Sequence, residues 1–268
     1  MTGIGPKEAS LIAAVSGKGL RVFTVAEAAE MLNITRVSAS DMVLRLLAKK
    51  KLIRIEKGKY LLIPPEAWNA GTYTEEGIII ASQLVKSYYL SYWTALSYYG
   101  WTEQPSKTIF IAASKRKNQL SVQGTTFKFI RLRSERFFGF SEQWVGNQKV
   151  AVAEREKAII DCLDQPRYAG EIVEIAKGLW NGRSTFDFPK LLNYALKMKN
   201  GTVIKRLGYL MEILNIENLR VINELKKYVT PGIMALDPSK EFKTAEISKR
   251  WNLYINVNPA NLTEWKTH

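Results

Sequence analysis

The sequence predicts an α+β fold, with an N-terminal winged helix-turn-helix followed by a larger mixed α+β domain. Three observations support this fold class. Three helical patterns and then a β-hairpin occupy residues 1–66, and helix, helix, tight turn, helix and wing is the winged helix order. The next stretch, of about 195 residues, mixes strand-like with helical segments. Of the 268 residues, 46% are apolar, which is the composition of a folded globular protein.

The first two helices are marked by their N-terminal residues. Pro6 suits the first turn of a helix over residues 6–16, which glycines follow. Thr24, with Glu27 three residues later, forms a capping box that opens a second short helix. Asn33 is a natural turn residue after it.

Thr35 opens a third helix that runs to about Lys50. We expect its core face to carry Ser40, Val43, Leu44 and Leu47. A β-hairpin follows, with strands over 52–55 and 60–63 joined by the turn Glu56-Lys57-Gly58-Lys59. Pro64-Pro65 ends the unit, so we place a winged helix domain at 1–66, a linker at 69–74 and an α+β domain at 74–268.

The second domain alternates helical and strand-like patterns. Helices are expected near 75–86, 91–99, 154–163, 169–177, 188–199, 202–215 and 216–228. Strands are expected at 108–112, 125–132 and 149–152. Two late apolar stretches, 233–236 and 253–257, are expected to add strands to the same sheet.

A formal charge of +14 makes nucleic acid the first partner to consider. In a winged helix the third helix enters the major groove of DNA. With the core face given above, its opposite face would carry Arg36, Ser38, Ala39, Met42 and Arg45, with Thr35 at the helix start beside phosphate. The wing would add backbone contacts from Arg54, Lys57 and Lys59.

A second interpretation of the winged helix remains open. Residues 1–66 carry 11 basic and 6 acidic side chains, and such charges can be a solvated surface. Winged helices also bind proteins, so the unit could belong to an adaptor.

A second basic cluster lies in the following domain. Its members are Lys115, Arg116, Lys117, Lys128, Arg131, Arg133 and Arg136. Strand alternation puts Lys128 on the face opposite Phe127 and Phe129, so part of the cluster lines one surface of a hairpin. This surface could contact DNA or an acidic partner, or it could be a charged edge that resists aggregation.

Seven aromatic side chains crowd residues 88–101. Aromatic residues can stack on single-stranded nucleic acid. The helical spacing of Tyr89, Trp93 and Leu96 favours core packing instead.

The composition argues against most enzymes. One cysteine and one C-terminal histidine exclude disulfide scaffolds, Cys/His zinc sites and histidine-based triads. Cys162 is expected to be a packed thiol. Glu154, Glu156 and Asp161 could serve a metal-dependent nuclease, but Arg155 and Lys157 favour an ordinary amphipathic helix. We therefore expect no enzyme, cofactor or metal, with a nuclease as the alternative.

No signal-peptide pattern begins the chain, and no window holds about 20 uninterrupted apolar residues. We expect a cytoplasmic, soluble protein with no membrane partner.

Four motifs accompany the winged helix pattern: YLSYWTALSYYGW at 89–101, VAVAEREKAIID at 150–161, LDPS at 236–239 and WNLYINV at 251–257. Their order and spacing over nearly the whole chain resemble the AbiEi-like antitoxin family, transcriptional regulators of bacterial and archaeal abortive-infection systems. Ala153-Glu154 and Ala158 depart from the usual residues at those positions.

The resemblance implies a two-part DNA-binding repressor and antitoxin. Its winged helix would bind inverted repeats in the operator of its own operon. Its larger domain would counteract a cognate nucleotidyltransferase-like toxin, in the type IV manner, without a stable toxin-antitoxin complex.

Overall fold

The computed structural model describes residues 3–65, 77–122, 124–146, 148–241 and 246–267. Contacts divide the chain into two compact units. The N-terminal unit combines Met1–Lys86 with Asn118–Phe127 and Gln143–Val150, and the C-terminal unit combines Ser87–Lys117, Lys128–Glu142 and Ala151–His268. The predicted linker at 69–74 lies outside the described residues.

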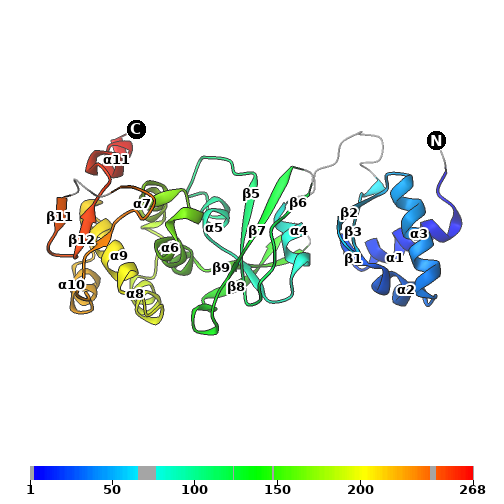
Figure 1. The fold of residues 1–268 in the computed structure, drawn as a ribbon, viewed down its shortest axis with the longest axis horizontal. Helices are drawn as coiled ribbons and strands as arrows, with labels where there is room; N and C mark the ends of the chain where they lie inside the picture. The colour runs from blue at the N-terminus through cyan, green and yellow to red at the C-terminus, as the bar shows by residue number, and fades with distance from the viewer. Residues whose placement is uncertain (1–2, 66–76, 123, 147, 242–245, 268) are drawn as a thin grey trace. The chain divides into compact units, whose positions relative to one another are not determined.

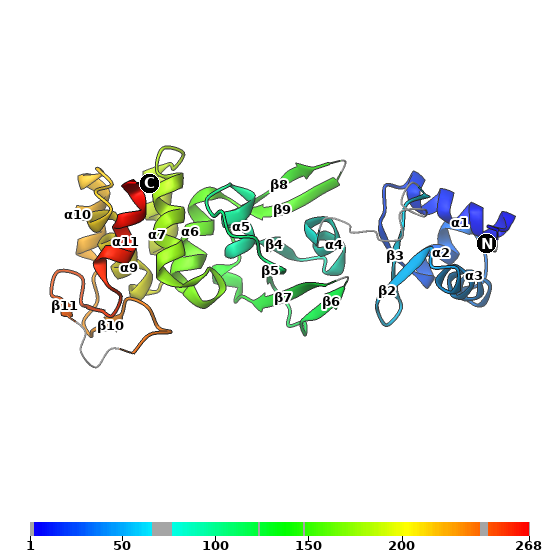
Figure 2. The same ribbon diagram turned by 90° about the horizontal axis from the view of Figure 1, so that it is seen from above.

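The predicted helix-turn-helix is present (Figures 1 and 2). Its helices are α1 (Pro6–Gly17), α2 (Val25–Leu32) and α3 (Arg36–Ala48). The capping box at the start of α2 is confirmed, because Glu27 N–H donates to Thr24 Oγ1 at 3.2 Å and Thr24 N–H donates to Glu27 Oε2 at 2.7 Å. Asn33 follows α2 in a left-handed conformation, with φ of 51°, and makes the tight turn before α3 possible.

The predicted hairpin forms the wing. Its strands are β2 (Leu52–Glu56) and β3 (Lys59–Leu62), and Gly58 takes φ of 78° in the turn. A short strand that the sequence did not predict, β1 (Val22–Thr24), pairs antiparallel with β3 and gives the order β1-β3-β2. The helices pack on this sheet through Leu11, Val15, Phe23, Val43, Leu46 and Leu62, all at most 1% exposed.

Helix α4 (Gly77–Leu84) groups with the winged helix by its contacts. The side-chain oxygen of Gln83 accepts hydrogen bonds from the backbone N–H of Val22 at 2.6 Å and of Arg21 at 3.2 Å. These bonds satisfy backbone donors at the start of β1, which pairs with β3 alone among the described strands.

The largest sheet has the strand order β6-β7-β5-β4-β9-β8 among the described residues. Its strands are β4 (Tyr88–Leu90), β5 (Thr108–Ala113), β6 (Leu120–Val122), β7 (Thr125–Arg131), β8 (Phe140–Val145) and β9 (Gln148–Ala153). The predicted strands are confirmed as β5, β7 and β9. Strand β4 pairs antiparallel with β5 and parallel with β9.

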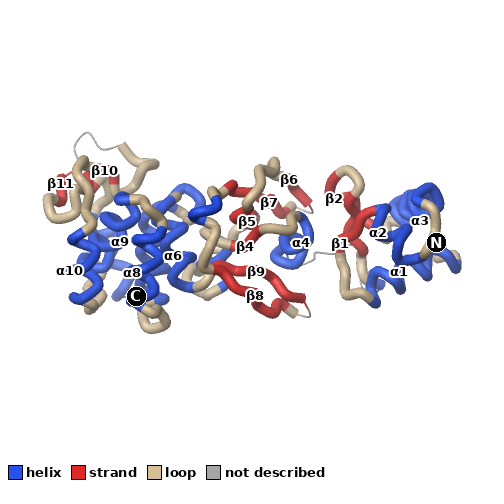
Figure 3. Tube along the Cα trace, turned by 90° about the horizontal axis from the view of Figure 1, so that it is seen from below, coloured by secondary structure: helices blue, strands red, loops and turns tan. Residues whose placement is uncertain are grey.

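Helices make up most of the rest of the C-terminal unit (Figure 3). They are α5 (Trp93–Tyr98), α6 (Arg155–Asp164), α7 (Glu171–Gly182), α8 (Phe188–Lys197), α9 (Gly201–Ile213), α10 (Leu219–Lys227) and α11 (Pro259–Thr263), with 3-10 turns at Ser134–Arg136, Pro166–Tyr168 and Glu264–Thr267. The predicted helices of this unit are present with shifted ends. Core packing of the aromatic segment is confirmed for Tyr88, Tyr89, Tyr92 and Trp101, which are at most 9% exposed.

The expected addition of the late strands to the large sheet is wrong. Strands β10 (Met234–Ala235), β11 (Glu246–Ser248) and β12 (Leu253–Ile255) form a separate sheet in the order β10-β12-β11. Helices lie between this small sheet and strands β4 and β5 of the large sheet (Figures 1 and 3). Contacts with the helices hold the segment there: among them, Asp237 accepts from the N–H of Ile172 at the start of α7 at 3.1 Å, and buried Trp251 lies against Gly208 of α9.

Candidate nucleic-acid interface

The start of α3 presents a polar corner. Thr35 is the N-cap, and its Oγ1 accepts from the N–H of Ser38 at 3.2 Å. Arg36 and Ser38 are exposed as predicted, and Arg36 makes no hydrogen bond or ion pair with the described part of the chain. A guanidinium at this position is available for an anion or a base edge.

The predicted orientation of α3 is wrong. Ala39 is 0% and Met42 3% exposed, so both lie in the core and not on the outward face. Leu44, predicted in the core, is 57% exposed. The buried set is Ala39, Met42, Val43 and Leu46.

The error is a rotation by one residue. The predicted and observed core sets have the same helical spacing of i, i+3, i+4 and i+7, and about 100° separates them. Val37, Leu44 and Leu47 make the helix apolar on several sides, so the hydrophobic periodicity alone could not decide which face is buried. Val37 and Leu44 therefore replace Ala39 and Met42 on the exposed surface.

Arg45 and Lys49 lie beside a buried acid from α1. Glu8 is 4% exposed, and its carboxylate accepts from Lys49 Nζ at 2.6 Å and from Gly5 N–H at 2.8 Å. The hydrogen bond from Lys49 is the main reason why the pKa of Glu8 is lowered. The Nε of Arg45 lies 3.7 Å from the same carboxylate, and its side chain is 56% exposed, so it can still contact a partner.

The three basic residues of the wing have different surroundings. Arg54 and Lys57 are exposed and have no polar partner within the described ranges. Lys59 instead forms an ion pair with Glu56 at 3.3 Å and donates to the carbonyl of Leu84 at 3.0 Å. Among the described residues, the ammonium of Lys57 therefore has no partner, whereas that of Lys59 is bound to Glu56 and to the end of α4.

The second basic cluster does not form one surface. Lys115, Arg116, Arg131 and Arg133 are exposed. Lys117 lies 5.5 Å from the ring centre of Phe129, and Lys128 lies 5.0 Å from that of Tyr168. Because residues 128 and 129 point to opposite faces of β7, Lys117 and Lys128 also lie on opposite faces.

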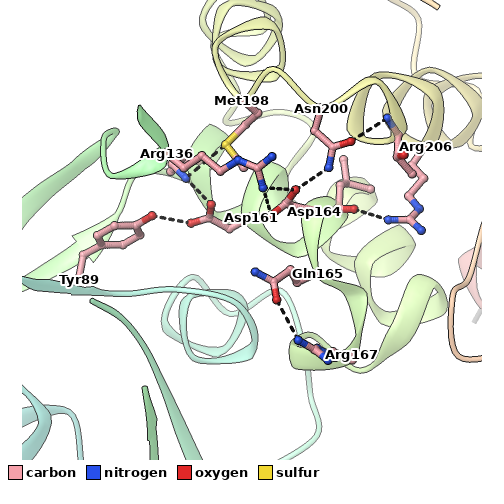
Figure 4. A network of polar contacts seen from close by, with 12 residues as sticks. Tyr89, Arg136, Asp161, Asp164, Gln165, Arg167, Met198, Asn200 and Arg206 are labelled. Carbon is pink, nitrogen blue, oxygen red and sulfur yellow. Dashed lines mark hydrogen bonds and ion pairs between the residues drawn. The ribbon is translucent and has the colours of Figure 1, made fainter. Parts of the chain in front are cut away.

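Arg136, also in this cluster, is bound within its own unit. Its Nη1 lies 3.1 Å from both carboxylate oxygens of Asp164, which also accepts from Asn200 at 2.6 Å (Figure 4).

The carboxylates considered for a nuclease are held by cations and hydroxyls. Asp161 is buried, pairs with Lys157 and accepts from Tyr89 Oη at 3.0 Å (Figure 4). Glu154 and Glu156 share Lys190 at 3.0 and 3.1 Å. Within the described ranges, no group of three or more His, Cys, Asp or Glu side chains could hold a metal ion.

The thiol of Cys162 is fully buried, as expected from the sequence. Burial raises its pKa well above the ordinary value. The thiol therefore stays protonated and serves packing.

Three helices, with a tight turn between the second and the third, followed by a two-stranded wing define the class of winged helix-turn-helix proteins. Residues 10–63 match the family described as "Transcriptional regulator, AbiEi antitoxin". The resemblance predicted from the sequence is confirmed over this segment.

Comparison of structures extends the fold similarity to the whole chain. The crystal structure of the RV2827C protein from Mycobacterium tuberculosis matches with a TM-score of 0.70 at 12% sequence identity, covering 100% of this chain and 97% of that one. A search of curated proteins gives no match. No helix in the described part of the chain is long and apolar enough to cross a membrane.

Proposed function

We propose that this protein is an autoregulatory repressor and antitoxin: it binds inverted repeats in the operator of its own operon and counteracts a nucleotidyltransferase-like toxin. The observation that supports this best is the AbiEi match at residues 10–63. The match covers α3 and the wing, where Arg36 and Lys57 are exposed and without a partner among the described residues.

In this proposal α3 enters the major groove and the wing follows the phosphate backbone. Arg36 at the first turn of α3 contacts a base edge or phosphate, with Thr35 and Ser38 beside it. Arg54 and Lys57 supply backbone charge, and Arg45 adds a contact from the flank of α3. Ala39 and Met42 position the helix from the core and do not touch DNA.

The DNA-binding part is tested with duplex DNA from upstream of this protein's own reading frame. Arg36→Ala should weaken specific binding by about 1 to 3 kcal/mol if the arginine makes a good base contact. Lys227→Ala is the matched control, because Lys227 is an exposed lysine of α10 with its side chain 66% exposed. Equal affinity of wild type and Arg36→Ala in a gel-shift titration would reject a direct role for this helix.

The antitoxin part is assigned to residues 74–268. This segment carries 28 basic and 19 acidic residues, so it can meet an anionic partner without the winged helix. The exposed residues Lys115, Arg116, Arg131 and Arg133 are its candidate contacts, either with the toxin or with the nucleic acid that the toxin modifies.

Co-expression with a nucleotidyltransferase-like toxin from the same operon, which the proposal requires, tests that assignment. Residues 74–268 should restore growth, and changing Lys115 and Arg116 to Ala should reduce the rescue. Rescue by the full chain only, with a soluble and cooperatively melting fragment, would show that neutralisation is not confined to this segment.

A further inference from the structure

The outward face of α3 carries a row of residues that packing does not explain. Val37 is 73% and Leu44 57% exposed, and Asp41, also exposed, lies between them. Positions 37, 41 and 44 follow the i, i+4 and i+7 spacing and so share one face, opposite the buried Ala39 and Leu46. An apolar pair around a single acid is an unusual composition for a helix that meets a polyanion.

Basic groups flank this row. Arg36 lies on one side of it and Arg45 on the other, by their positions around the helix. Val37 and Leu44 are seven residues apart, about 10 Å along the helix axis. That length is close to three base-pair steps of about 3.4 Å.

We propose that Val37 and Leu44 recognise the C5-methyl groups of two thymines in the major groove, and that Asp41 accepts a hydrogen bond from the N4 amino group of a cytosine between them. This inference rests on the proposed function, because it requires α3 to lie in the groove. It predicts the chemistry of the operator at the positions that α3 faces.

The major groove offers few partners for such side chains. Thymine is the base that presents a methyl group there, and apolar side chains contact it. Carboxylates accept from the N4 amino group of cytosine, the donor that a G·C pair presents. Asp41 would be repelled by phosphate, so it fits the floor of the groove and not its rim. Flanking arginines can contact phosphates while the row contacts bases.

The experiment starts from a randomised duplex library selected with the full-length protein. In the selected duplex, each thymine of the α3 contact region is replaced by deoxyuridine, which removes one methyl group and leaves base pairing intact. Binding by wild type should fall about three- to five-fold at two positions, the effect of losing one buried methyl-sized contact. Val37→Ala should lose sensitivity at one of them and Leu44→Ala at the other.

Asp41→Asn provides a second readout, because asparagine pairs with adenine through its N6 and N7 atoms. Repeating the selection with this variant should move the preference at the central position from cytosine to adenine. Leu219→Ala is the matched control: Leu219 of α10 is 73% exposed, like Val37, and its change should leave every binding constant unaltered.

The outcomes separate this inference from the proposed function. If the selected duplex binds tightly and deoxyuridine has no effect at any position, the methyl contacts are refuted while DNA binding stands. If Val37→Ala and Leu44→Ala bind DNA like wild type, the row serves another purpose, such as a protein partner. If selection yields no preferred duplex at all, the proposed function itself fails.

Discussion

Two lysines of the wing, two residues apart, should differ in their contribution to DNA binding. The ammonium of Lys59 is committed to Glu56 and to the carbonyl of Leu84, whereas Lys57 has no such partner within the described ranges. Lys57→Ala should therefore reduce the slope of log K against log salt by about 0.9, the value for one lost phosphate contact. Lys59→Ala should change the slope much less.

Binding titrations at several salt concentrations give both slopes. Equal reductions for the two variants would mean that Lys59 leaves its partners on DNA. A relaxed base preference in Lys57→Ala with an unchanged slope would mean that the wing reads bases.

At the residue scale, the sequence predicted polar positions better than the face of α3. Thr24, Thr35 and Asn33 lie where capping and turn chemistry place them, because these preferences depend on the local backbone. The burial of Ala39 and Met42 depends on packing against α1, α2 and the sheet. Lys59 binds Glu56 and the carbonyl of Leu84 at the end of α4. The contact with Leu84 could not be predicted, because nothing in the sequence around Lys59 indicates it.

At the element scale, buried Glu8 links α1 to the end of α3. Its pKa is lowered from 4.5 in the folded protein, mainly by the hydrogen bond from Lys49. A carboxylate with a lowered folded-state pKa contributes stability that is present above pH 4.5 and is lost as the pH falls through the folded-state value. Glu8→Gln should thus lower the stability of the winged helix at pH 7 and flatten its decline in acid.

Hydrogen exchange of α1 and α3 amides between pH 3 and 7 would measure this effect. The control is Glu30→Gln, because Glu30 is an exposed acid of α2. Parallel pH profiles for wild type and Glu8→Gln would contradict the assignment.

A buried ion pair within α6 is linked to the β4 region of the large sheet by hydrogen bonds. Lys157 and Asp161 are at most 1% exposed, and Tyr89 and Ser91 of the β4 region donate to Asp161 at 3.0 and 2.7 Å. Removing the ammonium leaves a carboxylate without its counter-charge, so Lys157→Ala should cost about 3 to 5 kcal/mol of unfolding free energy. The double change Lys157→Met and Asp161→Leu should recover only part of it, because the hydroxyls of Tyr89 and Ser91 lose their acceptor.

Denaturant unfolding of these variants, followed by the fluorescence of aromatic residues in the C-terminal unit, measures the loss of unfolding free energy. Lys227→Ala, at an exposed pair on α10, should cost no more than about 1 kcal/mol. If Lys157→Ala were as mild as this control, the charge of Lys157 would not be needed to stabilise the buried carboxylate of Asp161.

Long elements were predictable and the shortest ones were not. Helices α7 to α10 and strands β5, β7 and β9 are long enough to show a helical or strand-like hydrophobic periodicity in the sequence. Strands β1 and β4 have three residues each, and they exist because distant strands pair with them. The separate sheet of β10, β11 and β12 depends in the same way on nonlocal contacts, including the Asp237 bond to α7.

At the scale of the whole molecule, the fold class and the basic charge could be predicted from the sequence. The order of helices and wing in the structure and the AbiEi match over residues 10–63 agree with the predicted fold class. Contacts within the N-terminal unit extend past the predicted domain end at 66, because α4 packs against β1 through Gln83. A fragment that ends at residue 66 would therefore lose the contacts between α4 and β1.

The central claim is that α3 and the wing bind duplex DNA in the protein's own operator. Hydroxyl-radical footprinting of the upstream DNA with the full-length protein tests it most directly. Wild type should protect both halves of an inverted repeat, and the double variant Arg36→Ala and Lys57→Ala should lose that protection at the same protein concentration. An absence of any protected segment with wild type, or an unchanged footprint with the double variant, would contradict the claim.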